Sequence, residues 1–149
     1  MTRSRNPHKL ILGAFLGALF LWGVLSLHLN VQPSVAWVLH QWPMFFVFCV
    51  ASPILEEYVF RGLIYDAVDT RWPRVWPSGA RLWISSANVI TTFLFVIAHM
   101  IARDPIAGAL VLLPSIYLGL LRQRYDGIGP CMLVHSAWNI GWFSLFPPI

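Results

Sequence analysis

The stretch from Met44 to Gly62, MFFVFCVASPILEEYVFRG, joins a long uncharged run to three charged residues. Within this stretch no Asp, Glu, Lys or Arg occurs before Glu56, and Glu56, Glu57 and Arg61 then follow within one short segment. A membrane-spanning helix needs about 20 mostly apolar residues, and charged side chains within such a helix are costly. The stretch therefore predicts a membrane helix whose charges are buried for a functional or structural reason.

The composition of the whole chain also indicates a membrane protein. Of its 149 residues, 58% are hydrophobic and 11% are charged, whereas a soluble domain draws roughly 25% of its residues from Asp, Glu, Lys and Arg. So few charges cannot cover a water-exposed surface, which excludes an ordinary soluble domain and predicts contact with a lipid bilayer. The net charge of +4 comes from basic residues in short clusters between spans, so it reflects membrane orientation, and no nucleic-acid partner is expected.

Hydropathy predicts an all-α fold, a polytopic transmembrane helical bundle with about five spans. The expected spans cover residues 10–29, residues from 37 or 42 through the opening stretch, and residues 82–101, 106–121 and 130–146. The first is interpreted as a retained helix, because it is longer than the apolar part of a signal peptide and no A-x-A-like site follows. Residues 70–80, which contain Pro73 and Pro77, are expected to form an interfacial loop.

The basic residues predict the orientation of these spans. With the N-terminus in the cytoplasm, eight basic residues lie inside and only Arg103 lies outside, which favours a cytoplasmic N-terminus and an external C-terminus. The inside residues would be Arg3, Arg5, Lys9, Arg71, Arg74, Arg81, Arg122 and Arg124. The chain is expected to be one membrane domain, 1–149, with 1–36 as an added N-terminal span and loop and 45–146 as the functional core.

Spacing indicates which polar side chains of the spans act together. Glu57 and Arg61 are four residues apart on one helix face and are expected to pair. Glu56 lies about 100° around the helix from Glu57 and is expected to face a cavity. The third span contributes His99, and the fifth contributes His135 and Asn139, which also share a helix face. Pro53 is expected to kink the second span beside the carboxylates.

These residue types suit hydrolysis. A carboxylate in a site of low dielectric can accept a proton from water near neutral pH, and a neutral imidazole can hold the same water. A second imidazole and a carboxamide can donate hydrogen bonds to the oxyanion that forms when water attacks a carbonyl. Glu56, His99, His135 and Asn139 fill these roles, and Glu57 with Arg61 would orient them.

Each element also has a simpler explanation. Glu57 and Arg61 alone suggest a structural ion pair, His99 alone suggests a packed histidine, and His135 with Asn139 could be hydrogen-bonding groups between helices. Six polar groups on three spans of an otherwise apolar chain favour one shared functional cavity.

Three ordered motifs occur at these residues: EEYVFR from Glu56 to Arg61, FVIAH from Phe95 to His99, and HSAWN from His135 to Asn139. In this the chain resembles the CAAX protease and bacteriocin-processing membrane protease family, also called the Abi family. Its motifs are Glu-Glu-x-x-x-Arg, Phe-x-x-x-His and His-x-x-x-Asn/Asp. The resemblance covers about residues 45–146, and its flanks include the Ser85–Ser86 pair and the LGLLR segment that ends at Arg122.

The resemblance implies a glutamic intramembrane protease that uses neither a catalytic metal nor another cofactor. By that resemblance Glu56 would be the general base, His99 would help to activate the water, and His135 and Asn139 would line the oxyanion site. Glu57 and Arg61 would support them. The expected substrate is a membrane-anchored or lipid-modified peptide or protein, and the expected location is the plasma membrane of a prokaryote.

Several alternatives stay open at the level of sequence. One is a non-catalytic membrane immunity or scaffolding protein of the same fold, and another is a small proton-coupled transporter, because Glu and His also form proton relays. Two histidines and a glutamate could also bind zinc, which would make the chain a zinc-dependent membrane protease. Gly13 and Gly17 have the spacing of a helix-pairing motif and suggest a homo-oligomer formed through the first span.

Overall fold

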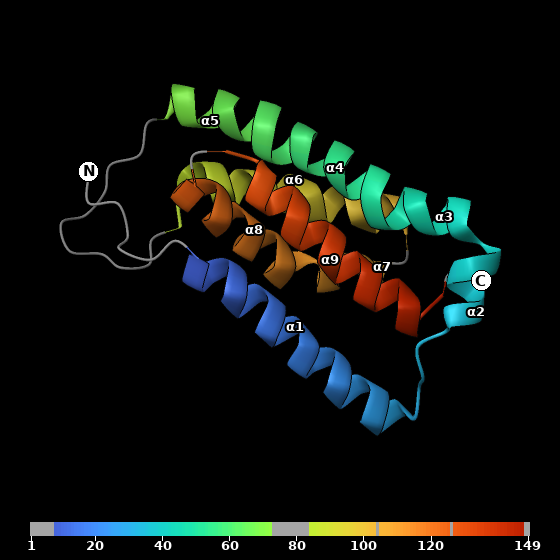
Figure 1. The fold of residues 1–149 in the computed structure, drawn as a ribbon. Helices are drawn as coiled ribbons and strands as arrows, with labels where there is room; N and C mark the ends of the chain where they lie inside the picture. Colours follow the sequence, from blue (N-terminus) through green and yellow to red (C-terminus); the bar gives the residue numbers. More distant parts are fainter. Residues whose placement is uncertain (1–7, 73–83, 104, 126, 148–149) are drawn as a thin grey trace. The chain divides into compact units, whose positions relative to one another are not determined.

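The computed structural model describes residues 8–72, 84–103, 105–125 and 127–147, and all regular elements in these ranges are helical (Figure 1). This confirms the predicted all-α class. The elements are α1 (His8–Leu29), α2 (Val35–His40), α3 (Trp42–Phe46), η1 (Val47–Ala51), α4 (Ser52–Glu57), η2 (Tyr58–Ile64), α5 (Tyr65–Arg71), α6 (Ser86–Ala102), α7 (Pro105–Leu110), α8 (Leu112–Tyr125) and α9 (Gly129–Leu145).

Two of the helical stretches described are long and apolar enough to cross a membrane: His8–Leu29 and Trp42–Arg71. The first coincides with the expected first span, and the second joins α3, η1, α4, η2 and α5 into one continuous rod that contains the opening stretch (Figure 1). The apolar helices α6 and α9 lie where the third and fifth spans were expected. Most of the expected interfacial loop, residues 70–80, lies outside the described residues.

The expected span over residues 106–121 is not a single helix. The chain forms α7 and α8 there, separated at Val111. Pro114 explains the break, because it has no N–H to donate to the carbonyl of Leu110 and its ring would clash with that carbonyl. The helix therefore restarts before Pro114, and Ser115 N donates to Val111 O at 2.9 Å.

The long rod is widened by π-helical turns on both sides of the carboxylates. In η1, Ser52 N donates to Val47 O, five residues back, in place of its α-helical partner Phe48 O. Pro53 follows directly and supplies no N–H of its own. In η2, Tyr65 N donates to Phe60 O and Gly62 O, in place of Arg61 O. The expected effect of Pro53 on the helix therefore takes the form of a widened turn, a feature found often at functional sites.

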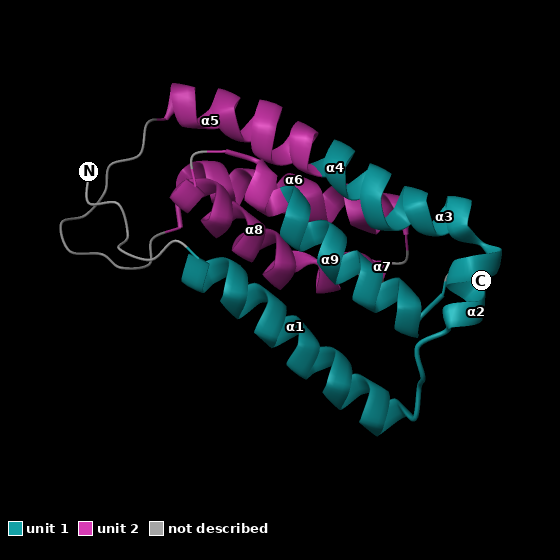
Figure 2. Ribbon diagram, in the orientation of Figure 1, with its two compact units in different colours: residues 1–56, 132–149 teal, residues 57–131 magenta. Residues whose placement is uncertain are grey.

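The chain divides into two compact units (Figure 2): residues 1–56 with 132–149, and residues 57–131. In the first unit α1 packs against α9 through small residues. Trp138 Nε1 donates to Ala14 O at 3.2 Å, and a Cβ added at Gly141 would lie 2.4 Å from the Trp22 ring. The other faces of α1 expose large apolar side chains such as Phe20 and Leu27, as lipid contact requires.

In the second unit α6 packs against α5, α7 and α8. Two glycines allow this close packing. A Cβ at Gly108 would lie 2.6 Å from the backbone of Met100, and a Cβ at Gly119 would lie 1.8 Å from Asn88 Oδ1. Asn88 is fully buried and donates to Ile116 O and Gln123 Oε1, both at 3.2 Å. Gly119 therefore allows a buried asparagine to join α6 to α8.

Replacing Gly119 with alanine is expected to destabilise the protein by about 1–3 kcal/mol, the usual cost of overpacking a filled interior. The new methyl group would displace Asn88 and break its hydrogen bonds to α8. Gly129→Ala is the matched control, because a Cβ there meets no described atom within 4 Å. Denaturant titrations of both variants in detergent would measure the effect, and equal stability of the two would contradict it.

Candidate active site

The predicted pairing of Glu57 and Arg61 is present and fully buried. Arg61 Nη1 donates to Glu57 Oε1 at 3.2 Å, and neither side chain is accessible to solvent. The pair follows one face of the rod because its members are one helical turn apart. A guanidinium this deeply buried needs compensation from more than one group.

Two further groups in the same unit compensate Arg61. Its Nη2 donates to Ser115 Oγ at 2.6 Å and to Ser115 O at 3.0 Å. Its Cζ also lies 4.5 Å from the centre of the Phe95 ring, a distance at which the ring face attracts a cation. Arg61 is therefore held by its own helix, by α6 and by α8, and its position is set by three elements.

Replacing Ser115 with alanine is expected to destabilise the protein by about 1–3 kcal/mol, because a buried donor of Arg61 loses its hydroxyl partner. Ser144→Ala is the control, because the Ser144 hydroxyl bonds back to Ile140 O in its own helix. Denaturation in detergent compares the two variants. A Ser115→Ala protein as stable as Ser144→Ala would show that the hydroxyl contributes nothing.

Glu56 has a different environment from its neighbour. Its side chain is half-buried, and Glu56 Oε2 lies 3.8 Å from His135 Nε2 of α9. This distance exceeds a direct hydrogen bond, and the ring nitrogen faces the carboxylate oxygen. Two adjacent carboxylates thus have different partners: an arginine neutralises Glu57, and an imidazole faces Glu56.

His99 lies in the last turn of α6 and packs against Phe95, with ring centres 4.2 Å apart and the ring planes tilted by 33°. Its Nδ1 lies 3.0 Å from Phe95 O. A carbonyl oxygen can only accept, so Nδ1 carries the hydrogen, and Nε2 of the neutral ring is then an acceptor. Phe95 therefore contacts both Arg61 and His99, and the ring nitrogen suited to accept a proton or bind a water is Nε2.

Asn139 holds the widened turn η1. Its Nδ2 donates to Phe48 O at 2.9 Å, the carbonyl that Ser52 N does not reach in the π-helical turn. The simpler explanation of Asn139, a hydrogen bond between helices, is therefore confirmed, whereas its specific partner in η1 was not expected from the sequence. One of the two amide hydrogens of Asn139 is therefore donated to Phe48 O, and the NH₂ group has a second hydrogen that can also donate.

The six expected residues fall into two sets. Glu56, His135 and Asn139 belong to the first unit, whereas Glu57, Arg61 and His99 belong to the second. Within the first unit Glu56 and His135 lie together, while Asn139 contacts Phe48 of η1. Within the second unit Phe95 connects Arg61 with His99.

Sequence reasoning missed a chain of buried polar groups beside Arg61. Ser115 Oγ donates to Thr92 Oγ1 at 3.2 Å, and Thr92 Oγ1 donates to Asn88 Oδ1 at 3.2 Å. A signal for part of it was present, since Asn88, Thr92, Phe95 and His99 recur at spacings of three and four on one face of α6. Ser115 carried no such signal, because its partner comes from another helix.

Most of the chain matches a known protein family. Residues 36–141 match the family described as type II CAAX prenyl endopeptidase Rce1-like, and all six candidate residues lie within the match. No curated protein and no solved structure matches the chain. The family consists of integral membrane proteases, in agreement with the apolar helices and their exposed apolar side chains. Because the match covers well over half of the chain, the protein belongs to the type II CAAX prenyl endopeptidase Rce1-like family and is a membrane-embedded protease.

Proposed function

We propose that the protein is a glutamic-type intramembrane endopeptidase that hydrolyses a peptide bond of a membrane-anchored or lipid-modified substrate. Glu56 and His99 activate the attacking water, and His135 and Asn139 bind the oxyanion. Glu57 and Arg61 hold the helix that carries Glu56. The three motifs and the family match support this assignment.

The proposed reaction is acid–base hydrolysis. Glu56 takes one proton from water while the water oxygen attacks the carbonyl carbon, and the electron pair of the C=O bond moves to oxygen. His135 and the second amide hydrogen of Asn139 stabilise that oxyanion. The oxyanion then re-forms the carbonyl as the C–N bond breaks, and the proton held by Glu56 passes to the leaving nitrogen.

The observation that carries the proposal is the contrast between the two adjacent glutamates. Glu57 is fully buried against Arg61, whereas Glu56 is half-buried and lies 3.8 Å from His135. A buried, neutralised carboxylate is a poor base toward water, while an accessible one beside an imidazole can accept a proton. In this proposal the neutral ring of His99 accepts a hydrogen bond from the attacking water through Nε2.

We propose one membrane domain over residues 1–149, with a core at 45–146 and about five spans. The 17-residue helices α6 and α9 are each about 26 Å long at 1.5 Å per residue, close to the roughly 30 Å of a bilayer core. The distribution of basic residues supports a cytoplasmic N-terminus and an external C-terminus in a prokaryotic plasma membrane. We also propose that the chain pairs with a second copy through its first span, because Gly13 and Gly17 have the spacing of a helix-pairing motif.

The test is cleavage of membrane-anchored peptides by purified protein in detergent or liposomes. One set of peptides carries a C-terminal prenylated cysteine, and a matched set carries a transmembrane anchor. His99→Ala should reduce cleavage strongly, whereas the exposed Arg71→Gln should leave it unchanged. Full activity of His99→Ala would rule out the proposed water activation.

A chelator separates the proposed mechanism from a zinc-dependent one. Hydrolysis by a glutamate base should be unaffected by chelation. Activity that is lost with chelator and restored by Zn²⁺ would instead establish the metal-dependent alternative. Binding of the peptides without cleavage would favour a non-catalytic protein of the same fold.

A further inference from the structure

The two π-helical turns of the long rod are supported in the same way. In η1 the carbonyl of Phe48 loses its α-helical donor and accepts a hydrogen bond from Asn139. In η2 the carbonyl of Arg61 loses its α-helical donor and accepts a hydrogen bond from Arg122 Nε at 3.0 Å. Asn139 belongs to the motifs of the expected site, but Arg122 does not.

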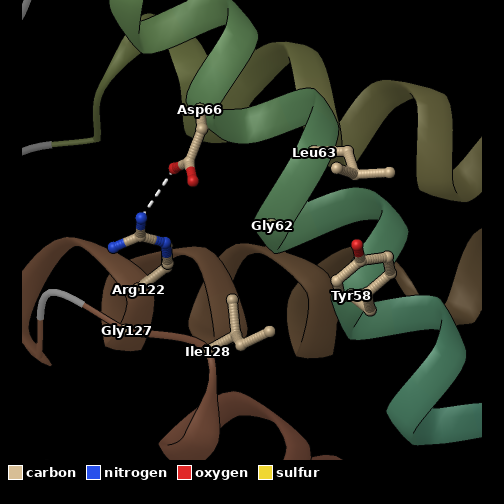
Figure 3. Close-up of a pocket in the computed structure, with 7 residues that line it drawn as sticks. All are labelled: Tyr58, Gly62, Leu63, Asp66, Arg122, Gly127 and Ile128. Atoms are coloured by element: carbon tan, nitrogen blue, oxygen red, sulfur yellow. Dashed lines mark hydrogen bonds and ion pairs between the residues drawn. The ribbon is translucent and has the colours of Figure 1, made fainter.

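Arg122 has three contacts with the second π-helical turn and the helix that follows it. Besides Nε on Arg61 O, its Nη2 donates to Asp66 Oδ1 at 2.6 Å, and its Cζ lies 5.3 Å from the Tyr65 ring. Figure 3 shows Arg122 directed from α8 toward Asp66, beside Gly62 of η2. One planar guanidinium therefore connects a backbone carbonyl, a carboxylate and an aromatic ring.

We propose that Arg122 is a positioning residue for the proposed active site: it holds the widened turn η2 in the geometry that aims Arg61 at Glu57 and Ser115. The inference rests on the proposed function. Arg61 contributes its carbonyl to Arg122 and its side chain to Glu57 and Ser115. A shift of its backbone therefore moves the group that neutralises Glu57, in the helix that carries Glu56.

The surroundings of Arg122 argue against a role in stability alone. The Arg122 side chain is 11% exposed, but its partner Asp66 is 57% exposed, and a cleft lined by Tyr58, Leu63 and Ile128 borders both residues (Figure 3). Because water reaches the carboxylate, this ion pair should contribute less to folding than a fully buried pair. The contact that fixes the backbone of η2 is the hydrogen bond from Arg122 Nε to the carbonyl of Arg61. Loss of this bond should therefore lower the rate of catalysis more than the stability of the protein.

The experiment compares Arg122→Gln, Arg122→Lys and the control Arg71→Gln. Arg71 is an exposed arginine of the same unit, at the end of α5. Arg122→Gln should lower kcat by about 10- to 100-fold with a nearly unchanged KM, the effect of a small misplacement in a catalytic site. Its melting temperature should stay close to that of Arg71→Gln. Lysine keeps the charge but lacks the planar fork, so Arg122→Lys should be impaired almost as strongly.

Amide hydrogen exchange gives a readout that does not need activity. Arg122→Gln and Arg122→Lys should both accelerate exchange in the peptide covering Tyr58–Ile64, and Arg71→Gln should not. Full rescue by lysine in both assays would overturn the inference, because charge alone would then suffice. Unchanged exchange and kcat in Arg122→Gln would overturn it too.

The outcomes also separate this inference from the proposed function. If no peptide is cleaved by the wild-type protein, the proposed function fails, while hydrogen exchange still tests Arg122. If Glu56→Gln is inactive but Arg122→Gln matches Arg71→Gln in both assays, only the role of Arg122 fails.

Discussion

Glu56→Gln is expected to reduce cleavage by roughly 10²- to 10⁴-fold, the usual contribution of a general base. Glutamine keeps the size of the side chain but cannot accept a proton from water at neutral pH. Substrate binding should persist, so the loss should appear in kcat, measured with an anchored peptide in detergent. The physical basis is the accessible position of Glu56 beside His135.

The control is the same change of acid to amide at another position of the rod, Asp69→Asn. It should cleave at close to the wild-type rate, since Asp69 lies in α5, beyond the expected site residues. A Glu56→Gln protein as active as Asp69→Asn would falsify the assignment of Glu56 as the base.

Glu57→Gln is expected to destabilise the protein by about 3–5 kcal/mol, the typical cost of removing one partner of a buried ion pair. Both side chains of the Glu57–Arg61 pair are inaccessible to solvent, so the guanidinium cannot recover its hydration when the charge of Glu57 is removed. Unfolding by denaturing detergent, followed by circular dichroism, would measure the loss.

Two further variants test whether burial determines how much the Glu57–Arg61 pair contributes to stability. Asp66→Asn removes the charge of an exposed carboxylate that pairs with Arg122 and should cost less than about 1 kcal/mol. Glu57→Leu combined with Arg61→Met replaces both charges with apolar groups of similar size and should be less destabilised than Glu57→Gln. If Glu57→Gln and Asp66→Asn lose equal stability, burial does not control the strength of the first pair.

Local patterns predicted the features that depend on neighbours along the chain. The apolar run from Leu10 to Leu29 predicted α1, and the spacing of Glu57 and Arg61 predicted their pairing. Pro53 indicated a disturbed helix beside the carboxylates, although the structure shows a widened π-helical turn there. The stretch expected to span the membrane at residues 106–121 is divided into α7 and α8, because hydropathy does not register the N–H that Pro114 lacks.

The sequence by itself determined the membrane class, the helical fold and the candidate residues, because hydropathy and helical spacing are properties of neighbouring residues. Only the tertiary structure decided which side chains form hydrogen bonds with the two widened turns and with the buried arginine. Asn139 reaches Phe48 O, Arg122 reaches Arg61 O, and Ser115 reaches the Arg61 guanidinium. Each of these hydrogen bonds joins helices far apart in the chain, and a carbonyl left without its helical donor accepts whichever donor the packing brings within about 3 Å.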